Sequence, residues 1–227
     1  RYRFKDELAS YASPVVRSID GERWAFAFLR GGLLAFEPES GRERFFYAWR
    51  ASRLESVNAS TPVVVGRDVL ITESYGPGAS LLRVGGAAPE VIWRDLPRQR
   101  PRLACHWSTP IHHEGFLYAS SGEKSGSADL VAIDWATGEV RWRQPGLRRS
   151  SLLYVDGHLV VLTEYGDLLL VEARPDRYHA VAKVRLMDER RRPLLRYPAW
   201  SAPILSHGIL YLRSEGRLTA LRLIAEG

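Results

Sequence analysis

The sequence predicts an all-β propeller built from four-stranded antiparallel blades, and three observations lead to this prediction. A motif of Ser or Thr followed by Pro and aliphatic residues returns along the chain. Short apolar or β-branched runs follow each copy, separated by turns that contain glycine. No stretch shows sustained helical spacing of apolar residues at i, i+3, i+4 and i+7, so strands are favoured throughout.

The repeat occurs in five copies. Pro14, Pro62 and Pro110 stand near the start of the first three copies, 48 residues apart. Leu152 takes the proline position in the fourth copy and Pro203 in the fifth, at further intervals of 42 and 51 residues. Repeats of roughly 40–50 residues with four strands each are typical of propeller blades.

Each copy predicts the same succession of elements. An aliphatic strand comes first, glycine-containing turns separate it from a second and a third strand, and a fourth strand ends near an aromatic residue where the copy is complete. Glycine between short apolar runs is typical of β-hairpins. We therefore expect one propeller domain over residues 1–227, with blades at about 13–50, 61–94, 108–146, 150–187 and 201–227.

The two ends of the repeat indicate an incomplete ring. The fifth copy stops after its third strand, and Tyr2–Phe4 precedes the first copy where a fourth strand belongs. Residues 1–5 are thus expected to form the outer strand of either a preceding blade or the closing blade. We favour the first alternative, with the chain as the C-terminal part of a larger propeller. Missing blades or a protein partner would then cover the open edge.

A second pattern covers the turn between the third and fourth predicted strands of the third copy. Ala132, Asp134, Thr137, Gly138 and Trp142 form the motif A-x-D-x-x-T-G-x-x-x-W, and a softened version recurs in the first copy at the same spacing. Thr-Gly can make a tight turn, and the aspartate can accept hydrogen bonds from its amides. The tryptophan can lie across the neighbouring blade. Because the pattern recurs, we interpret it as structural rather than catalytic.

This motif, with the Ser/Thr-Pro openings, resembles the pyrroloquinoline-quinone-like (PQQ-like) propeller repeats. These are the tryptophan-docking blades of quinoprotein alcohol dehydrogenases and of their non-enzymatic relatives. The resemblance covers essentially the whole chain, although the motif is complete only in the third copy. It implies a ring of seven or eight blades, of which five are counted here, and a periplasmic or extracellular location.

Two functions follow from the resemblance. The leading hypothesis is a non-catalytic binding or scaffold module for protein or ligand interaction, with no cofactor and no assigned catalytic residue. The alternative is a PQQ- and Ca²⁺-dependent oxidoreductase acting on alcohols or sugars. Cys105 is the only cysteine, so the disulfide that caps PQQ in many such enzymes cannot form. Ca²⁺ prefers six to eight oxygen ligands, and the single asparagine, Asn58, has no acidic cluster near it in sequence.

Other classes of function are less favoured. The net charge is +6, but the basic residues are scattered and no run is long enough for a nucleic-acid arm, even at Arg98–Arg102. No apolar run approaches the roughly 20 residues of a membrane span. A metal site at Cys105, His106, His112 and His113 is not expected. Neighbouring strand residues face opposite ways, and the spacing matches no zinc finger.

The repeat alignment also predicts a ligand face. Propellers usually bind at one end of the central channel, on the loops that lead into the innermost strands. The candidates on these loops, three or four residues before each proline position, are Tyr11, Asn58, His106, Trp107, Arg149 and Trp200. Such side chains suit a flat or anionic ligand or a peptide. Alternatively, the aromatic residues only pack between blades.

Overall fold

In the computed structural model, the chain folds into five antiparallel β-sheets. The structure describes residues 10–53, 56–86 and 88–224. Strands β1 to β19 and one short 3₁₀ turn, Ser125–Ser127, are the regular elements of these residues. No helix in this part of the chain is long and apolar enough to cross a membrane. The expected outer strand at residues 1–5 lies outside the described residues.

Each sheet is a meander of strands that follow one another in the chain. The first sheet contains β1 (Val15–Ile19), β2 (Glu22–Leu29), β3 (Gly32–Phe36) and β4 (Glu43–Ala48). The second contains β5 (Val63–Val65), β6 (Asp68–Glu73), β7 (Gly78–Arg83) and β8 (Glu90–Arg94). The third contains β9 (Ile111–His113), β10 (Phe116–Ser121), β11 (Asp129–Asp134) and β12 (Val140–Gln144). The fourth contains β13 (Ser150–Val155), β14 (His158–Thr163), β15 (Asp167–Glu172) and β16 (Ala180–Arg185). The fifth has three strands, β17 (Ile204–Ser206), β18 (Ile209–Ser214) and β19 (Arg217–Arg222).

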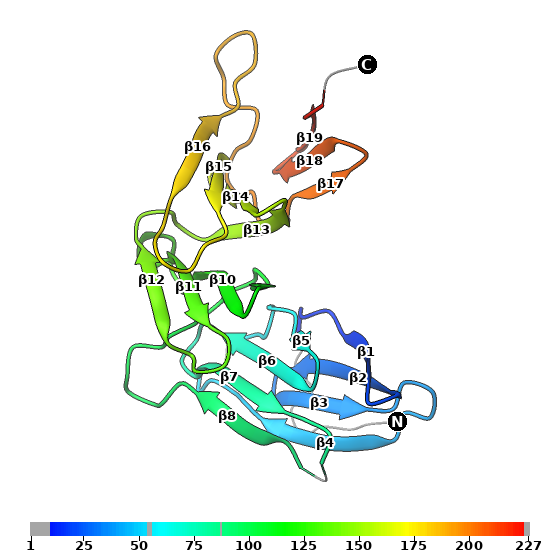
Figure 1. The fold of residues 1–227 in the computed structure, drawn as a ribbon. Coiled ribbons are helices and arrows are strands. Elements are labelled where there is room, and N and C mark those ends of the chain that lie inside the picture. The colour runs from blue at the N-terminus through cyan, green and yellow to red at the C-terminus, as the bar shows by residue number, and fades with distance from the viewer. Residues whose placement is uncertain (1–9, 54–55, 87, 225–227) are drawn as a thin grey trace.

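The sheets follow one another around an arc, with β4, β8, β12 and β16 on its outer side (Figure 1). This arrangement confirms the predicted fold class, an all-β propeller of antiparallel blades. The hairpin turns follow the expected chemistry, since Asp156 and Gly157 connect β13 to β14 and both have positive φ angles.

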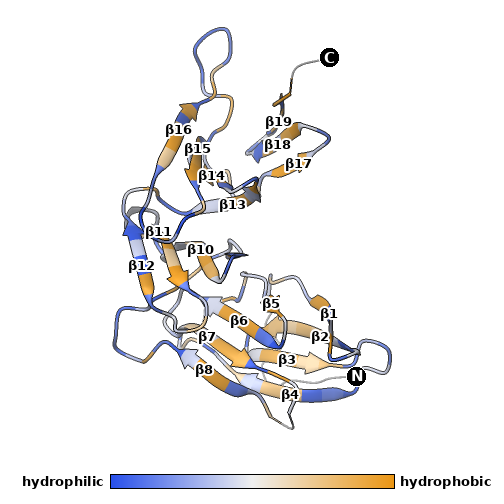
Figure 2. Cartoon of the chain, in the orientation of Figure 1, coloured by the Kyte–Doolittle hydropathy of each residue, from blue (hydrophilic) through white to orange (hydrophobic). Residues whose placement is uncertain are grey.

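Hydrophobic side chains fill the space between successive sheets, and Figure 2 shows the apolar strands that supply them. One cluster joins the first and second sheets, with Phe26 and Phe28 against Ile71. Three further clusters join the second sheet to the third, the third to the fourth and the fourth to the fifth. Among the described residues, no such cluster joins the fifth sheet to the first. The core is therefore divided among the junctions between blades.

The fifth sheet has one covered and one open face. Leu205 and Leu221 pack toward the fourth sheet. Because side chains alternate along a strand, Ile204 and Leu218 point the other way, and they are 61% and 69% exposed. The expectation that further blades or a protein partner cover this open edge stays a prediction.

Candidate functional site

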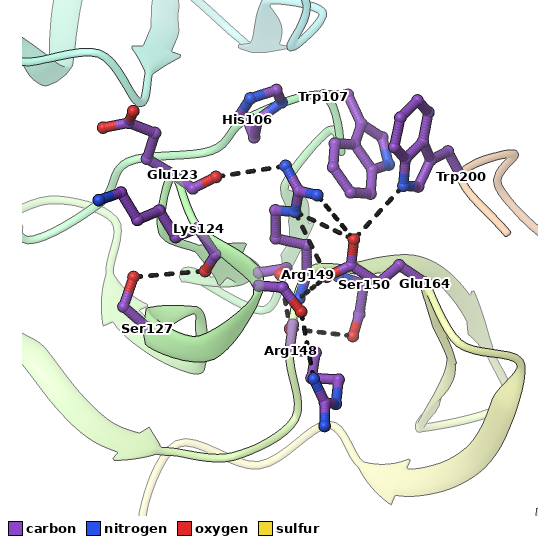
Figure 3. Close-up of polar contacts among 12 residues, drawn as sticks. His106, Trp107, Glu123, Lys124, Ser127, Arg148, Arg149, Ser150, Glu164 and Trp200 are labelled. Atoms are coloured by element: carbon purple, nitrogen blue, oxygen red, sulfur yellow. Dashed lines mark hydrogen bonds and ion pairs between the residues drawn. The ribbon is translucent and has the colours of Figure 1, made fainter. Parts of the chain in front are cut away.

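The loops that lead into β9, β13 and β17 bring four of the six predicted ligand-face residues together (Figure 3). His106 and Trp107 precede β9, Arg149 precedes β13 and Trp200 precedes β17. The ring centroids of Trp107 and Trp200 lie 5.2 Å apart, and those of His106 and Trp107 lie 5.3 Å apart. We call these four residues, together with Glu164, the aromatic–arginine cluster.

An ion pair between Arg149 and Glu164 forms the centre of this cluster. Glu164 directly follows β14, and its side chain is fully buried. The Arg149 guanidinium donates to Glu164 Oε2 through Nη2 at 2.7 Å and through Nε at 3.1 Å. The same guanidinium lies 4.7 Å from the ring centroid of Trp107, a cation–π contact. The arginine thus connects the buried carboxylate to the tryptophan.

The environment of Glu164 keeps this carboxyl ionised. Burial by itself raises its pKa, but hydrogen bonds from Arg149 and Ser125 and the charge of Arg149 lower it, so that the pKa lies below its usual value. The Trp200 indole N–H is a further, more distant donor, at 3.5 Å from Oε2. At neutral pH the cluster therefore holds a buried, fully compensated charge pair.

Exposed aromatic rings extend the cluster across the fourth and fifth sheets. Trp200, Tyr197 and Tyr165 are 44%, 43% and 39% exposed. Tyr197 contacts Trp200 edge-to-face at 5.9 Å and Tyr165 at 5.0 Å between centroids. The guanidinium of Arg148 lies 4.5 Å from the Tyr165 ring. The result is a continuous aromatic surface with a cation at its edge.

A hollow of about 350 Å³ adjoins Trp200 at the fifth sheet. Pro198, Trp200 and Ser201 line one part of it, and residues 213–216 line the rest. The aromatic surface therefore continues into a concave region.

On the other side of Trp107, His106 packs against Tyr75. The Tyr75 hydroxyl and His106 Nε2 are 3.0 Å apart, and the two ring centroids are 5.2 Å apart. Burial, and then the charge of Arg149, lower the pKa of His106. The imidazole is consequently neutral at pH 7 and packs as an aromatic ring.

A second buried carboxyl lies next to Tyr75. Glu73, the last residue of β6, is 1% exposed, and its Oε2 accepts a hydrogen bond from the Tyr75 backbone N–H at 2.7 Å. Its other oxygen has no hydrogen-bond partner among the described residues. Burial is the main reason why its pKa rises to about 7. Sequence analysis did not single out this group.

Tyr11 and Asn58 lie apart from the cluster. Asn58 is 3% exposed, and its amide donates to the Leu29 carbonyl at 2.6 Å. Its backbone carbonyl accepts from the Tyr11 N–H at 2.9 Å, while the Tyr11 side chain is 71% exposed. Asn58 is thus used in holding the first two sheets together, and the ring of six candidates is not assembled.

The A-x-D-x-x-T-G-x-x-x-W motif makes contacts within its turn and across a junction. Asp134 Oδ1 accepts hydrogen bonds from the Thr137 N–H at 2.9 Å and from its hydroxyl at 3.0 Å. Gly138 has a φ of +70°, and a Cβ there would lie 2.7 Å from the Trp93 ring. The Trp142 indole donates to the Arg174 carbonyl of the fourth sheet at 2.9 Å, and Ala132 packs in the same junction. These contacts give the motif a structural use.

The candidate metal ligands point to different partners. The Cys105 thiol is buried, which raises its pKa to about 12. His112 packs on Trp135, and His113 Nε2 lies 3.2 Å from the Tyr154 hydroxyl. Within the described ranges, no three His, Cys, Asp or Glu residues are grouped to hold a metal ion. The four candidates are therefore not assembled into one ligand set.

Sequence reasoning missed Glu164 and the two exposed tyrosines. Glu164 is an acid two residues after the end of the apolar run Leu159–Leu162, which was the available signal of a carboxyl at the end of a buried strand. Tyr165 and Tyr197 carry no such signal, because they lie in loops outside the aligned positions.

The five meandering sheets define a propeller, and the aromatic–arginine cluster lies on the loops that lead into the first strands of its third, fourth and fifth sheets, with Glu164 following β14. A family model described as outer membrane protein assembly factor BamB matches residues 2–143 and 80–177, which together are more than half of the chain. The chain belongs to this family, which confirms the PQQ-like resemblance.

A curated relative, the outer membrane protein assembly factor BamB of Alkalilimnicola ehrlichii, is 29% identical over 74% of this chain and 52% of its own length. The chain thus spans about half the length of this relative. The crystal structure of BamB from Moraxella catarrhalis superposes with a TM-score of 0.61 at 13% identity, covering 94% of this chain and 58% of that one. A quinohemoprotein alcohol dehydrogenase of Pseudomonas putida gives 0.62 at 14% identity, covering 99% and 43%. These two structures show the shared fold alone.

Proposed function

We propose that this chain is a non-catalytic scaffold that binds protein partners during outer-membrane protein assembly, with the aromatic–arginine cluster and the exposed aromatic surface that extends it as its binding face. Membership of a family described as an outer membrane protein assembly factor supports the biological setting. The observation that carries the assignment of the face is the run of exposed rings Tyr165, Tyr197 and Trp200 beside Arg148.

The chemistry of this face suits protein recognition. Tryptophan, tyrosine and arginine supply most of the binding energy at protein interfaces, because each buries a large area and keeps a polar group. The ion pair between Arg149 and buried Glu164 fixes the position of Trp107 and Trp200 before any partner arrives. A pre-ordered surface loses little side-chain entropy on binding.

A periplasmic location is part of the same proposal. The curated relative is named as an outer membrane protein assembly factor, and a scaffold for that process would act at the inner face of the outer membrane. The single buried cysteine neither requires nor opposes an oxidising compartment.

The oxidoreductase alternative is less well supported. The dehydrogenase match rests on 14% identity and shows fold only, whereas the family model and the curated relative are both described as an outer membrane protein assembly factor. We expect no change in melting temperature when PQQ is added, with or without Ca²⁺. A saturable, Ca²⁺-dependent rise would favour the enzyme instead, because a ligand at 100 times its Kd stabilises a folded protein by about 2.7 kcal/mol.

Photo-crosslinking tests the scaffold proposal directly. A benzophenone amino acid replaces Trp200 in the full chain, which is expressed with a periplasmic signal in a bacterium that has an outer membrane. The matched control replaces Val181, an exposed apolar residue on the outer strand β16. We expect an outer-membrane assembly protein to be linked at position 200 and not at position 181. No adduct at 200, or the same adducts at both positions, would contradict the proposal.

A further inference from the structure

A second concave site lies at the junction of the first and second sheets. It is a hollow of about 480 Å³, large enough for a small ligand or a few peptide side chains. Three segments line the hollow: residues 48–52 at the end of β4 and beyond it, residues 76–77 between β6 and β7, and four residues at the end of β8 and beyond it (Arg94, Asp95, Pro97 and Arg98). None of them belongs to the aromatic–arginine cluster.

The floor of this hollow is rigid. The Trp49 indole is almost fully buried and donates to the Gly78 carbonyl at 3.2 Å. The Asp95 carboxylate accepts from the backbone N–H groups of Ala79 at 2.9 Å and Arg102 at 3.0 Å. Gly78 has a φ of +75°, and a Cβ there would lie 2.4 Å from Asp95 Oδ2. The Asp95 carboxylate therefore holds two backbone segments in place, and its hydrogen-bonding capacity is used within the protein.

The rim carries positive charge that the described residues do not neutralise. Arg94 and Arg98 are exposed, and no carboxylate in the described ranges pairs with either guanidinium. By contrast, nearby Arg100 and Arg143 both pair with Asp129. The basic run at Arg98–Arg102 is thus divided between internal ion pairs and this rim.

We propose that this hollow, called here the arginine pocket, binds the carboxylate side chains of an acidic peptide segment from a protein partner. The planar guanidinium groups of Arg94 and Arg98 present paired donors that match a carboxylate. The lining residues Ala51, Pro77 and Pro97 offer apolar contact to the aliphatic part of a glutamate or to a neighbouring residue. The inference rests on the proposed function only in taking the partner to be a protein.

The surroundings favour an acidic peptide over other anions. A free phosphate would leave the apolar walls without a contact. An extended nucleic acid needs a continuous basic track, but the nearby arginines on the third sheet side are engaged with Asp129. A carboxylate on a short peptide can pair with the guanidinium groups of Arg94 and Arg98 while the rest of the peptide contacts the apolar walls.

The test is binding of a fluorescein-labelled octapeptide of alternating glutamate and alanine to the full chain, followed by fluorescence anisotropy. The same peptide with glutamine in place of glutamate is the uncharged probe. The test variant is Arg94→Gln with Arg98→Gln. The control variant, Arg17→Gln with Arg177→Gln, removes the same charge from exposed positions elsewhere.

We expect the glutamate peptide to bind the wild type and the control variant equally, and the test variant about ten-fold or more weakly. The uncharged peptide should not bind. Equal weakening in both variants would reduce the effect to general charge attraction and overturn the proposal. Unchanged binding to the test variant, or displacement of the peptide by inorganic phosphate at equal concentration, would also overturn it. Crosslinking at Trp200 does not depend on any of these results, so a failure of either proposal can be recognised separately.

Discussion

Two buried glutamates, at the ends of the second strands of the second and fourth sheets, differ in their charge. Glu73 and Glu164 are 1% and 0% exposed. Burial raises the pKa of Glu73 to about 7, whereas Glu164 also faces hydrogen bonds and positive charge from Arg149, and its pKa falls below the usual value. The pKa values of these two buried carboxyl groups are therefore shifted in opposite directions.

The difference in pKa comes from the guanidinium of Arg149, which pairs with Glu164. Arg149 stands three residues before the proline position of the fourth copy, and Ala59 occupies the same position in the second copy. In the second sheet, one oxygen of the Glu73 carboxyl has no hydrogen-bond partner within the part of the chain that the structure describes. In the fourth sheet, Arg149 and Glu164 form an ion pair on which Trp107 and Trp200 are arranged. The two acids also stand at different repeat positions, 11 residues after Pro62 and 12 residues after Leu152. The contrast therefore lies in the surroundings of two buried carboxyls rather than in one substitution in a repeat.

The largest expected effect is the loss of Arg149. Arg149→Ala leaves the Glu164 charge buried without compensation, and we expect the free energy of unfolding to fall by about 3 kcal/mol or more. Urea unfolding followed by tryptophan fluorescence measures this. Combining Arg149→Met with Glu164→Gln should recover much of the loss, because both charges are then removed. If Arg149→Ala were as stable as the wild type, Arg149 would not be the group that compensates the buried charge of Glu164.

The next largest effect expected is the contribution of Glu73 to the pH dependence of the free energy of unfolding. Below its ordinary pKa of 4.5, both the folded and the unfolded chain hold the proton. Between that value and about 7, only the folded chain holds it, so the stability falls as the pH rises, by up to about 3 kcal/mol. Glu73→Gln should abolish this loss and be more stable than the wild type at about pH 8, with little difference at about pH 4. Urea unfolding at both pH values decides it, and an equal pH dependence in both proteins would contradict the raised pKa.

A smaller effect is expected when the third donor to Glu164 is removed. Trp200→Phe keeps the aromatic ring but removes the indole N–H, which lies 3.5 Å from Oε2. We expect a loss of less than about 1 kcal/mol in the free energy of unfolding. A loss as large as that of Arg149→Ala would mean that the tryptophan, rather than the arginine, holds the carboxylate.

The smallest effect concerns the surface pair Arg53–Glu123, whose charges act on Glu73 from a distance. Arg53 lowers the pKa of Glu73 and Glu123 raises it. Arg53→Gln should therefore move the titration of Glu73 upward and Glu123→Gln should move it downward, while either change alters stability by less than about 0.5 kcal/mol. Carbon NMR of the Glu73 carboxyl follows the titration. If the pKa of Glu73 moved in the same direction in both variants, the opposite effects ascribed to Arg53 and Glu123 would be wrong.

Much of the fold could be predicted because it depends on local patterns. The Pro and Gly spacings identify the strands of each sheet, and Thr137–Gly138 predicts the turn between β11 and β12. The site was predicted in part, since alignment selected His106, Trp107, Arg149 and Trp200. It also selected Tyr11 and Asn58, because a repeat position shows where a residue lies along its blade but not which groups it meets across a junction.

The sequence by itself determined the strand pattern, the blade period and the loops that end at one side of the propeller, because these follow from hydrophobic alternation and turn chemistry within about 50 residues. Only the tertiary structure decided which loop side chains meet. Arg149 and Glu164 come from different loops of one sheet, and Trp107 and Trp200 come from different sheets. Their meeting depends on how successive blades are placed, which the hydrophobic clusters between the sheets determine. The protonation of Glu73 and Glu164 follows from that packing, because desolvation and the nearest guanidinium act only at short range.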